Sequence, residues 1–245
     1  MSLFVFEHVT KRHWDGRRPF TVLDDVSFEL DAGDFVGIWG MRRSGKSTLL
    51  RLAAGLELPD EGRILFDGQD LTALSGDARA ELLRARGIGY VTSTWRPRVR
   101  QQAIEYVALP LLADSLSLHQ ARQVAREELE RMGALNCAHM LSDSLSLGEA
   151  LRVGLAAALV HEPRLLLVDE PAVVLSPSER QELYELIASL GRASMPAVLV
   201  ASEDVGIVRR ARRMMTLGGG VLRSSDKEGE VVSFPRGRVA DGRSG

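Results

Sequence analysis

This chain of 245 residues has one cysteine, few aromatic residues, little net charge and no long apolar run. The single cysteine, Cys137, excludes an internal disulfide framework and suits a reducing compartment. No segment approaches the ~20 apolar residues that span a bilayer, and no basic segment precedes the first apolar run, so we expect neither a membrane helix nor a secretory signal. The net charge of -2 provides no overall attraction to nucleic acid. We therefore expect a soluble protein; if it works at a membrane, a partner supplies the membrane part.

What the sequence does contain is a glycine-rich loop between an apolar strand pattern at 35–39 and an apolar helix pattern that ends near residue 55. The loop and helix start read Gly40, Met41, Arg42, Arg43, Ser44, Gly45, Lys46, Ser47, Thr48. In this context the backbone N–H groups and the helix dipole form a phosphate site. Lys46 can reach the outer phosphates, and the hydroxyl of Ser47 can ligate Mg²⁺. A simple glycine-rich turn is the alternative, which Lys-Ser directly after the second glycine disfavours.

A second motif places two carboxylates at the end of an unbroken apolar run, 165–168, which is typical of a central parallel strand. Ligands of open α/β sheets lie at the carboxyl ends of the strands. Asp169 is therefore a candidate ligand of Mg²⁺, and Glu170 a candidate base for the water that attacks the γ-phosphate. The alternative is that the two acids only cap the next helix. The phosphate loop earlier in the chain favours the functional interpretation over this one.

The remaining periodicity predicts an alternation of strands and helices. We expect further strands at 3–8, 22–30, 63–66, 88–92, 197–201 and 214–217. We expect further helices at 77–86, 104–112, 118–132, 149–160, 178–190 and 204–212. Residues 11–20 are polar and predict a loop, and the composition after residue 224 predicts a disordered tail.

With these motifs in place, the chain resembles the nucleotide-binding subunit of ABC transporters over nearly its whole length. The matching segments are 22–28, 40–48, 59–62, 164–171 and 145–149, the last of which stands where the family has its Leu-Ser-Gly-Gly-Gln/Glu signature. The stretch Ala-Leu-Pro-Leu-Leu at 108–112 is similar to the lipoprotein-releasing and macrolide-export branch.

This resemblance implies an α/β fold: a RecA-like P-loop NTPase core with an antiparallel β portion and an inserted α-helical lobe. The ATPase domain would cover 1–224, with its core at 1–92 and 162–224, its helical lobe at 93–161 and the tail at 225–245. The resemblance also implies ATP and Mg²⁺ as cofactors, a second ATP-binding subunit in a head-to-tail homo- or heterodimer, and a transmembrane permease as partner, on the cytoplasmic face of the cell membrane. Nucleic acid is not an expected partner.

The resemblance further implies roles for individual residues. Lys46 and Glu170 would be catalytic. Ser47, Asp169 and Ser93 would hold the metal. Across the dimer, the signature residues Ser146, Gly148 and Glu149 would meet the nucleotide of the other subunit. Either His13 or Trp14 would stack on adenine, although a loop residue packed on the sheet is an alternative for both.

Several positions depart from the family pattern. Ser93 replaces a Gln that touches magnesium and the permease, and Leu147 replaces a signature Gly, where a side chain can block close backbone approach. Glu203 replaces a His that contacts the γ-phosphate, so its charge should repel phosphate unless it turns to solvent or caps the next helix. Arg43 replaces a frequent Gly; with Arg42, it is either solvated or lends charge to the nucleotide.

A further departure is Ser176, which stands where the family has Asp. Followed by Pro177 and by Glu179, it predicts a helix N-cap with a capping box, a structural role.

Three functions remain open on these grounds. The first is ordinary ATP hydrolysis that drives a permease. The second is a regulatory or heterodimeric half that binds ATP with little hydrolysis, which the departures favour. The third is a soluble ABC ATPase without a membrane partner. Proteins of that class usually carry a coiled-coil insertion or a second copy of the domain, and this sequence shows neither. A P-loop kinase would leave the segment 145–149 without a role.

Overall fold

The computed structural model describes residues 2–84, 87–93, 100–171, 175–192 and 196–225, and its described strands form two sheets. A four-stranded antiparallel sheet has the order β2-β1-β4-β5. Its strands are β1 (Phe4–Asp15), β2 (Arg18–Leu30), β4 (Glu61–Phe66) and β5 (Gln69–Asp70). A six-stranded sheet has the order β10-β9-β3-β8-β7-β6 and is parallel except for β10. Its strands are β3 (Phe35–Trp39), β6 (Ile88–Thr92), β7 (Leu165–Asp169), β8 (Ala197–Ser202), β9 (Arg213–Gly218) and β10 (Val221–Ser225).

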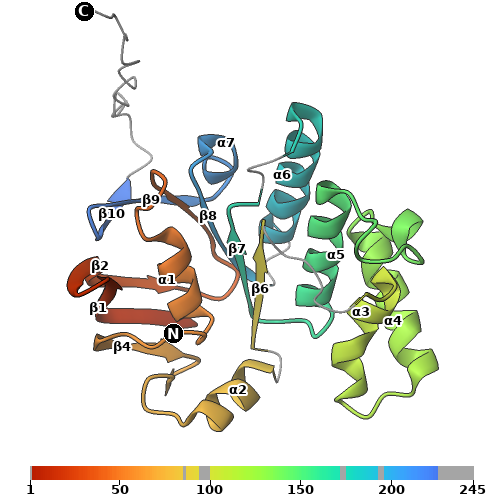
Figure 1. Ribbon diagram of the computed structural model, residues 1–245, viewed down its shortest axis with the longest axis horizontal. Coiled ribbons are helices and arrows are strands. Elements are labelled where there is room, and N and C mark those ends of the chain that lie inside the picture. The colour runs from red at the N-terminus through yellow and green to blue at the C-terminus, as the bar shows by residue number, and fades with distance from the viewer. Residues whose placement is uncertain (1, 85–86, 94–99, 172–174, 193–195, 226–245) are drawn as a thin grey trace, which may run out of the picture.

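Helices cover both faces of the six-stranded sheet. They are α1 (Lys46–Ala53), α2 (Gly76–Arg84), α3 (Ala103–Leu112), α4 (Leu118–Arg131), α5 (Leu147–Leu159), α6 (Pro177–Arg192) and the single-turn α7 (Val205–Val208), with a 3-10 turn at Leu135–Cys137. Figure 1 shows α1 between the two sheets, whereas α3, α4 and α5 gather at the opposite side of the molecule. These three helices lie between β6 and β7 in the chain.

The core has two parts because the central strands are buried on both faces. On β7, Leu165 and Leu167 pack into a cluster with α1 and the antiparallel sheet. The alternate residues, Leu166 and Val168, pack into a second cluster with α5 and α6. Successive strand side chains point to opposite faces, so an unbroken apolar run fits this position. The run therefore holds the end of β7, and with it Asp169 and Glu170, at a constrained place.

The predicted loop at residues 11–20 is wrong, because β1 and β2 continue through it as a hairpin. Their register pairs His13 with Phe20 and Asp15 with Arg18 around a turn where Gly16 has a φ of 60°. Side chains in this part of the hairpin are mostly exposed on both faces, so no apolar alternation marks it as strand. Backbone pairing, rather than burial of side chains, makes these residues extended.

Two further predictions differ from the structure at the carboxyl end of the chain. The predicted helix at 204–212 is only the single turn α7, and β10 was not expected. β10 follows the Gly218–Gly220 turn and pairs antiparallel with β9. The predicted tail lies outside the described residues except for Ser225, which ends β10. Within the described part of the chain, no helix is long and apolar enough to cross a membrane.

Candidate functional site

The two glycines of the phosphate loop are required by their surroundings. A Cβ on Gly40 would lie 2.6 Å from the carbonyl oxygen of Leu217 and 2.5 Å from Ser44 Oγ. Gly45 has a φ of 102°, which side-chain-bearing residues rarely adopt, and a Cβ there would lie 2.9 Å from the carbonyl oxygen of Val22. The loop thus connects β3 closely to α1, whose first turn has no side-chain cap. The amide end of α1 is available to an anion.

Lys46 lies at the centre of this loop and is 5% exposed. Its Nζ donates hydrogen bonds to the carbonyl oxygens of Gly40, at 2.8 Å, and Met41, at 3.0 Å. The same atom lies 2.9 Å from Glu170 Oε1. The loop therefore aims one ammonium group at the carboxylate that follows β7, and Gly40 and Met41 take part through their carbonyls.

Glu170 is held in an unusual conformation by its neighbours. Its φ is 48°, a left-handed value that costs a non-glycine residue on the order of 1 kcal/mol. The Ser202 hydroxyl donates to Glu170 Oε2 at 3.1 Å, and the backbone N–H of Glu203 donates to both carboxylate oxygens at 3.1 Å. The end of β8 therefore fixes the carboxylate next to Lys46.

Asp169 lies beside this pair and is 6% exposed. Burial raises the pKa of its carboxyl group; the charge of Glu170 adds to the effect, while hydrogen bonds from Ser47 and Tyr90 oppose it. The Tyr90 hydroxyl donates to Oδ2 at 3.2 Å, whereas Oδ1 is buried with no hydrogen-bond partner among the described residues. A buried oxygen without a partner, on a carboxyl group that also interacts with the Ser47 hydroxyl, matches the oxygen ligands that Mg²⁺ prefers. These residues thus fit a magnesium ion.

A cavity of about 580 Å³ opens in front of these groups. Its wall is formed by the loop from Arg42 to Thr48 together with Ser93, Glu170 and Glu203. Ser93 also donates its backbone N–H to the carbonyl oxygen of Asp169 at 3.1 Å. The cavity therefore joins the open end of α1 to the end of β7, which is where a bound phosphate chain would need its cation and its base.

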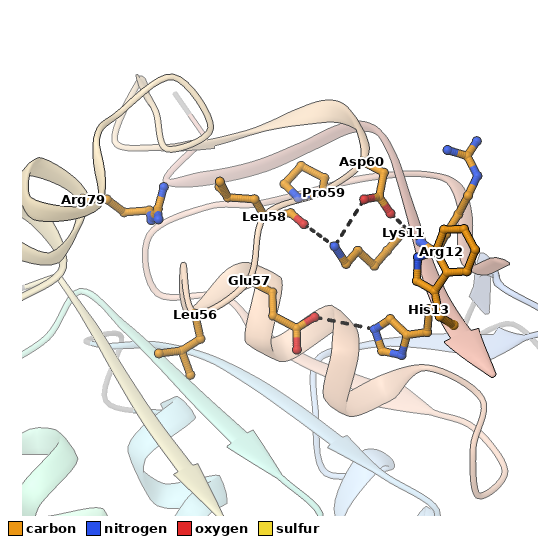
Figure 2. Close-up of a pocket in the computed structure, with 10 residues that line it drawn as sticks. Lys11, Arg12, His13, Leu56, Glu57, Leu58, Pro59, Asp60 and Arg79 are labelled. Carbon is orange, nitrogen blue, oxygen red and sulfur yellow. Dashed lines mark hydrogen bonds and ion pairs between the residues drawn. The ribbon is translucent and has the colours of Figure 1, made fainter. Parts of the chain in front are cut away.

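The rim of the cavity includes His13 and Phe20, whose rings meet edge to face with centroids 6.0 Å apart. Trp14 is 70% exposed and lines a neighbouring groove instead. Figure 2 shows that groove, with His13 directed toward Glu57 at 3.7 Å. Of the two predicted base-stacking residues, the structure therefore brings only His13 to the cavity.

Ser146, Gly148 and Glu149 line a separate hollow of about 500 Å³, which shares no residue with the cavity of Lys46. Ser146 caps α5: its Oγ accepts from the N–H of Glu149 at 3.3 Å, and its own N–H donates to Glu149 Oε2 at 2.9 Å. Within one chain, these signature residues do not meet the phosphate loop.

Comparison with known proteins agrees with this geometry. A family model described as ABC transporter matches residues 23–173. The lipoprotein-releasing system ATP-binding protein LolD of Pseudomonas syringae pv. tomato is 38% identical over 213 residues, which cover 86% of this chain and 93% of that protein. The chain belongs to the ABC transporter family. The predicted family is thereby confirmed, together with its lipoprotein-releasing and macrolide-export branch, and the chain is called the cassette below.

Solved structures confirm the predicted fold class. The ATP-binding cassette MJ0796, described as a dimer in a post-hydrolysis state bound to ADP and Pi, has a TM-score of 0.84 and 28% identity, covering 93% of this chain and 100% of that one. The structure of cbiO1 from Clostridium perfringens, part of the ABC transporter complex cbiONQ, has a TM-score of 0.77 and covers 90% of this chain and 86% of that one; at 24% identity it bears on the fold alone. The cassette is an ATP-binding protein of the RecA-like type.

Two departures from the family pattern have visible roles in the cassette. Ser176 caps α6: its Oγ accepts from the N–H of Glu179 at 3.4 Å, and its own N–H donates to Glu179 Oε2 at 3.0 Å. Glu203 is exposed and lines the phosphate cavity, while Asp204, not Glu203, caps α7.

Sequence reasoning did not predict three residues that line the cavity: Phe20, Val22 and Arg51. Phe20 is 49% exposed on a strand that was expected to be a loop, and a prediction of the β1–β2 hairpin would have placed it opposite His13. Arg51 lies one turn into α1 and pairs with Glu57, Nε to Oε1, at 2.6 Å. Helical spacing from Ser47 is the signal that points to Arg51.

Proposed function

We propose that the cassette binds ATP with Mg²⁺ in the cavity of Lys46 and hydrolyses it slowly. The observation that carries this proposal is the contact of one buried ammonium with both loop carbonyls and Glu170. In this scheme the open end of α1 and Lys46 bind the outer phosphates, and Glu170 accepts the proton of the attacking water. Phosphoryl transfer needs little beyond such positioning and charge neutralisation.

The metal would be held by the Ser47 hydroxyl and the Asp169 carboxylate, with Ser93 near enough in the cavity wall to act through water. Bound there, Mg²⁺ would neutralise charge on the phosphates. Around it, the residues of the chain orient the nucleotide: His13 and Phe20 form the wall for the base, and Tyr90 orients Asp169 through its hydrogen bond.

We further propose that the cassette works as a homo- or heterodimer, because its signature hollow and its phosphate cavity are separate within one chain. A head-to-tail second subunit would bring Ser146, Gly148 and Glu149 to the nucleotide of its neighbour. Family membership supports a transmembrane permease as the other partner, with the cassette peripheral on the cytoplasmic face of the cell membrane. The proposed lobes are the core, 1–92 and 162–224, and the helical lobe, 93–161.

The decisive experiment is calorimetric titration of the purified cassette with ATP in the presence and absence of Mg²⁺, beside Lys46→Ala. We expect the parent to bind ATP and Lys46→Ala to lose at least about tenfold in affinity, because a charge-assisted contact to phosphate is removed. Steady-state phosphate release by the parent should be slow. Equal binding by parent and Lys46→Ala contradicts the proposed site.

A second candidate function is a regulatory or heterodimeric half that clamps ATP with little hydrolysis. It is favoured by the carboxylate of Glu203 in the phosphate cavity and by the exposed Leu147 in the signature. Replacing Glu203 by His restores the family residue, and Glu203→Gln removes only the charge. A rise in phosphate release with His but not with Gln favours this candidate; no rise with either counts against Glu203 as the limiting departure.

A further inference from the structure

The charges that line the phosphate cavity are not all paired. Among the described residues, Lys46 pairs with Glu170 and Arg51 pairs with Glu57. Arg42, Arg43 and Glu203 line the same cavity, and their side chains make no ion pair within the described part of the chain. Two cations and one anion are therefore left to face a nucleotide that carries several negative charges.

The backbone distinguishes the two arginines. Arg43 has a φ of 65°, whereas Arg42 is not among the residues with positive φ. The left-handed region is unfavourable for a residue with a Cβ and free of cost for glycine. The N–H of Ser44 donates to the carbonyl oxygen of Met41 at 3.1 Å, so Arg43 is the third residue of a turn whose positive φ is typical of type II and favours glycine. Glycine would serve that backbone as well, so the arginine side chain at this position requires an explanation.

The guanidinium explains why an unfavourable residue is tolerated. Arginine matches phosphate oxygens with two parallel N–H donors and keeps its charge at every accessible pH. Glu203 presents an exposed carboxylate in the same cavity, which repels phosphate, most strongly the nucleotide with most charge. A compensating cation is most effective on the loop that holds the phosphates, and Arg43 belongs to that loop.

We propose that Arg43 is a specificity-determining residue that offsets the charge of Glu203 toward the outer phosphates, so that this pair sets the preference of the cavity for ATP over ADP. The inference rests on the proposed function of the same cavity. It implies that the two residues are coupled through the bound nucleotide. Loss of the Arg43 side chain weakens the binding of ATP more than that of ADP, and loss of the Glu203 charge strengthens the binding of ATP more than that of ADP.

The test is a double-mutant cycle measured by calorimetry with MgATP and MgADP. Arg43→Gly should weaken MgATP about tenfold, the equivalent of one charge-assisted hydrogen bond, and MgADP much less. Glu203→Gln should strengthen MgATP, and the double variant should return toward the parent ratio of the two affinities. Arg42→Gly makes the same charge change on the neighbouring wall residue and should change that ratio clearly less than Arg43→Gly does.

Folding is controlled separately. Arg43→Gly should melt no lower than the parent without nucleotide, because glycine adopts the left-handed conformation freely. If it does melt lower, Arg43→Asn replaces it in the cycle, since asparagine tolerates this conformation and carries no charge. With either variant folded, the two affinities can be compared directly.

An unchanged ratio of ATP to ADP affinity in the folded Arg43 variant overturns the inference, as does an equal change in Arg42→Gly, which would show a general effect of charge. If either result accompanies strong loss of binding in Lys46→Ala, the inference fails and the proposed function stands. If Lys46→Ala binds ATP like the parent, both fail together.

Discussion

Lys46 Nζ and Glu170 Oε1 are 2.9 Å apart, although one residue begins α1 and the other follows β7. The ammonium that would bind the outer phosphates is thus in contact with the carboxylate that would activate water. A phosphate group at Lys46 competes with Glu170 for the same donor. Ser202 and the backbone of Glu203 hold the carboxylate in place when that contact is exchanged.

Glu170→Gln tests this competition. We expect hydrolysis to fall about 10²- to 10⁴-fold, as for loss of a general base. ATP affinity should be equal to or a few-fold above that of the parent, because a neutral amide competes less for Lys46. Phosphate release and calorimetry measure the two effects. Glu162→Gln is the matched control, since Glu162 also has positive φ, 51°, and lies outside the cavity. Parent-like turnover in Glu170→Gln would remove this residue from catalysis.

Alanine variants of Phe20 and Trp14 test whether an aromatic residue must line the cavity to bind the base, because both side chains are exposed but only Phe20 lines the cavity. Phe20→Ala should weaken ATP about five- to tenfold, since a base–aromatic contact is worth ~1 kcal/mol or more. Trp14→Ala should have little effect, because Trp14 lines the neighbouring groove. Inorganic triphosphate, which has no base, should bind both variants like the parent. The assignment of the base wall is wrong if Trp14→Ala shows the larger loss.

Ser146 and Ser117 form the same capping box on different helices. Comparing their alanine variants therefore distinguishes an effect on stability from an effect on turnover. Each Ser→Ala change should lower the free energy of unfolding by about 1 kcal/mol, because a helix cap is lost. Turnover should fall in Ser146→Ala alone, since only Ser146 lies in the signature hollow. Urea unfolding and phosphate release on the same preparations decide the matter. Similar losses of turnover in both variants would mean that Ser146 acts only through the helix.

Acid should remove the stabilising effect of Asp204. Burial alone would raise the pKa of its carboxyl group, but the hydrogen bond from Gly206 and the ion pair with Arg180, among others, outweigh it and hold the pKa below 3.8. A lowered pKa stabilises the folded state above the unfolded value, and this stabilisation is lost as the pH falls through the folded value. The difference in unfolding free energy between parent and Asp204→Asn should therefore be largest near neutral pH and shrink below pH 3.8. A difference that stays constant down to the acid limit would exclude this linkage.

The buried strands could be predicted closely because their own residues carry the signal. Residues 88–92 were expected as a strand and form β6 over the same bounds. Residues 35–39, which form β3, and residues 165–168 of β7 are apolar, and glycines with Lys-Ser mark the loop. The hairpin of β1 and β2 could not be predicted in the same way. The side chains near its turn are mostly exposed on both faces, so their polarity does not alternate and gives no sign of the backbone pairing.

The sequence by itself determined the chemistry of this protein: a phosphate loop with Lys46 and Ser47, and the carboxylates of Asp169 and Glu170 after a buried strand. The tertiary structure alone decided which groups meet. It brought Lys46 to Glu170, placed Phe20 opposite His13, and kept Ser146 away from the loop of its own chain. The physical reason is range. Strand, loop and cap signals act between neighbours in the chain, whereas a cavity is made by strand pairing and close packing between segments that the sequence leaves far apart.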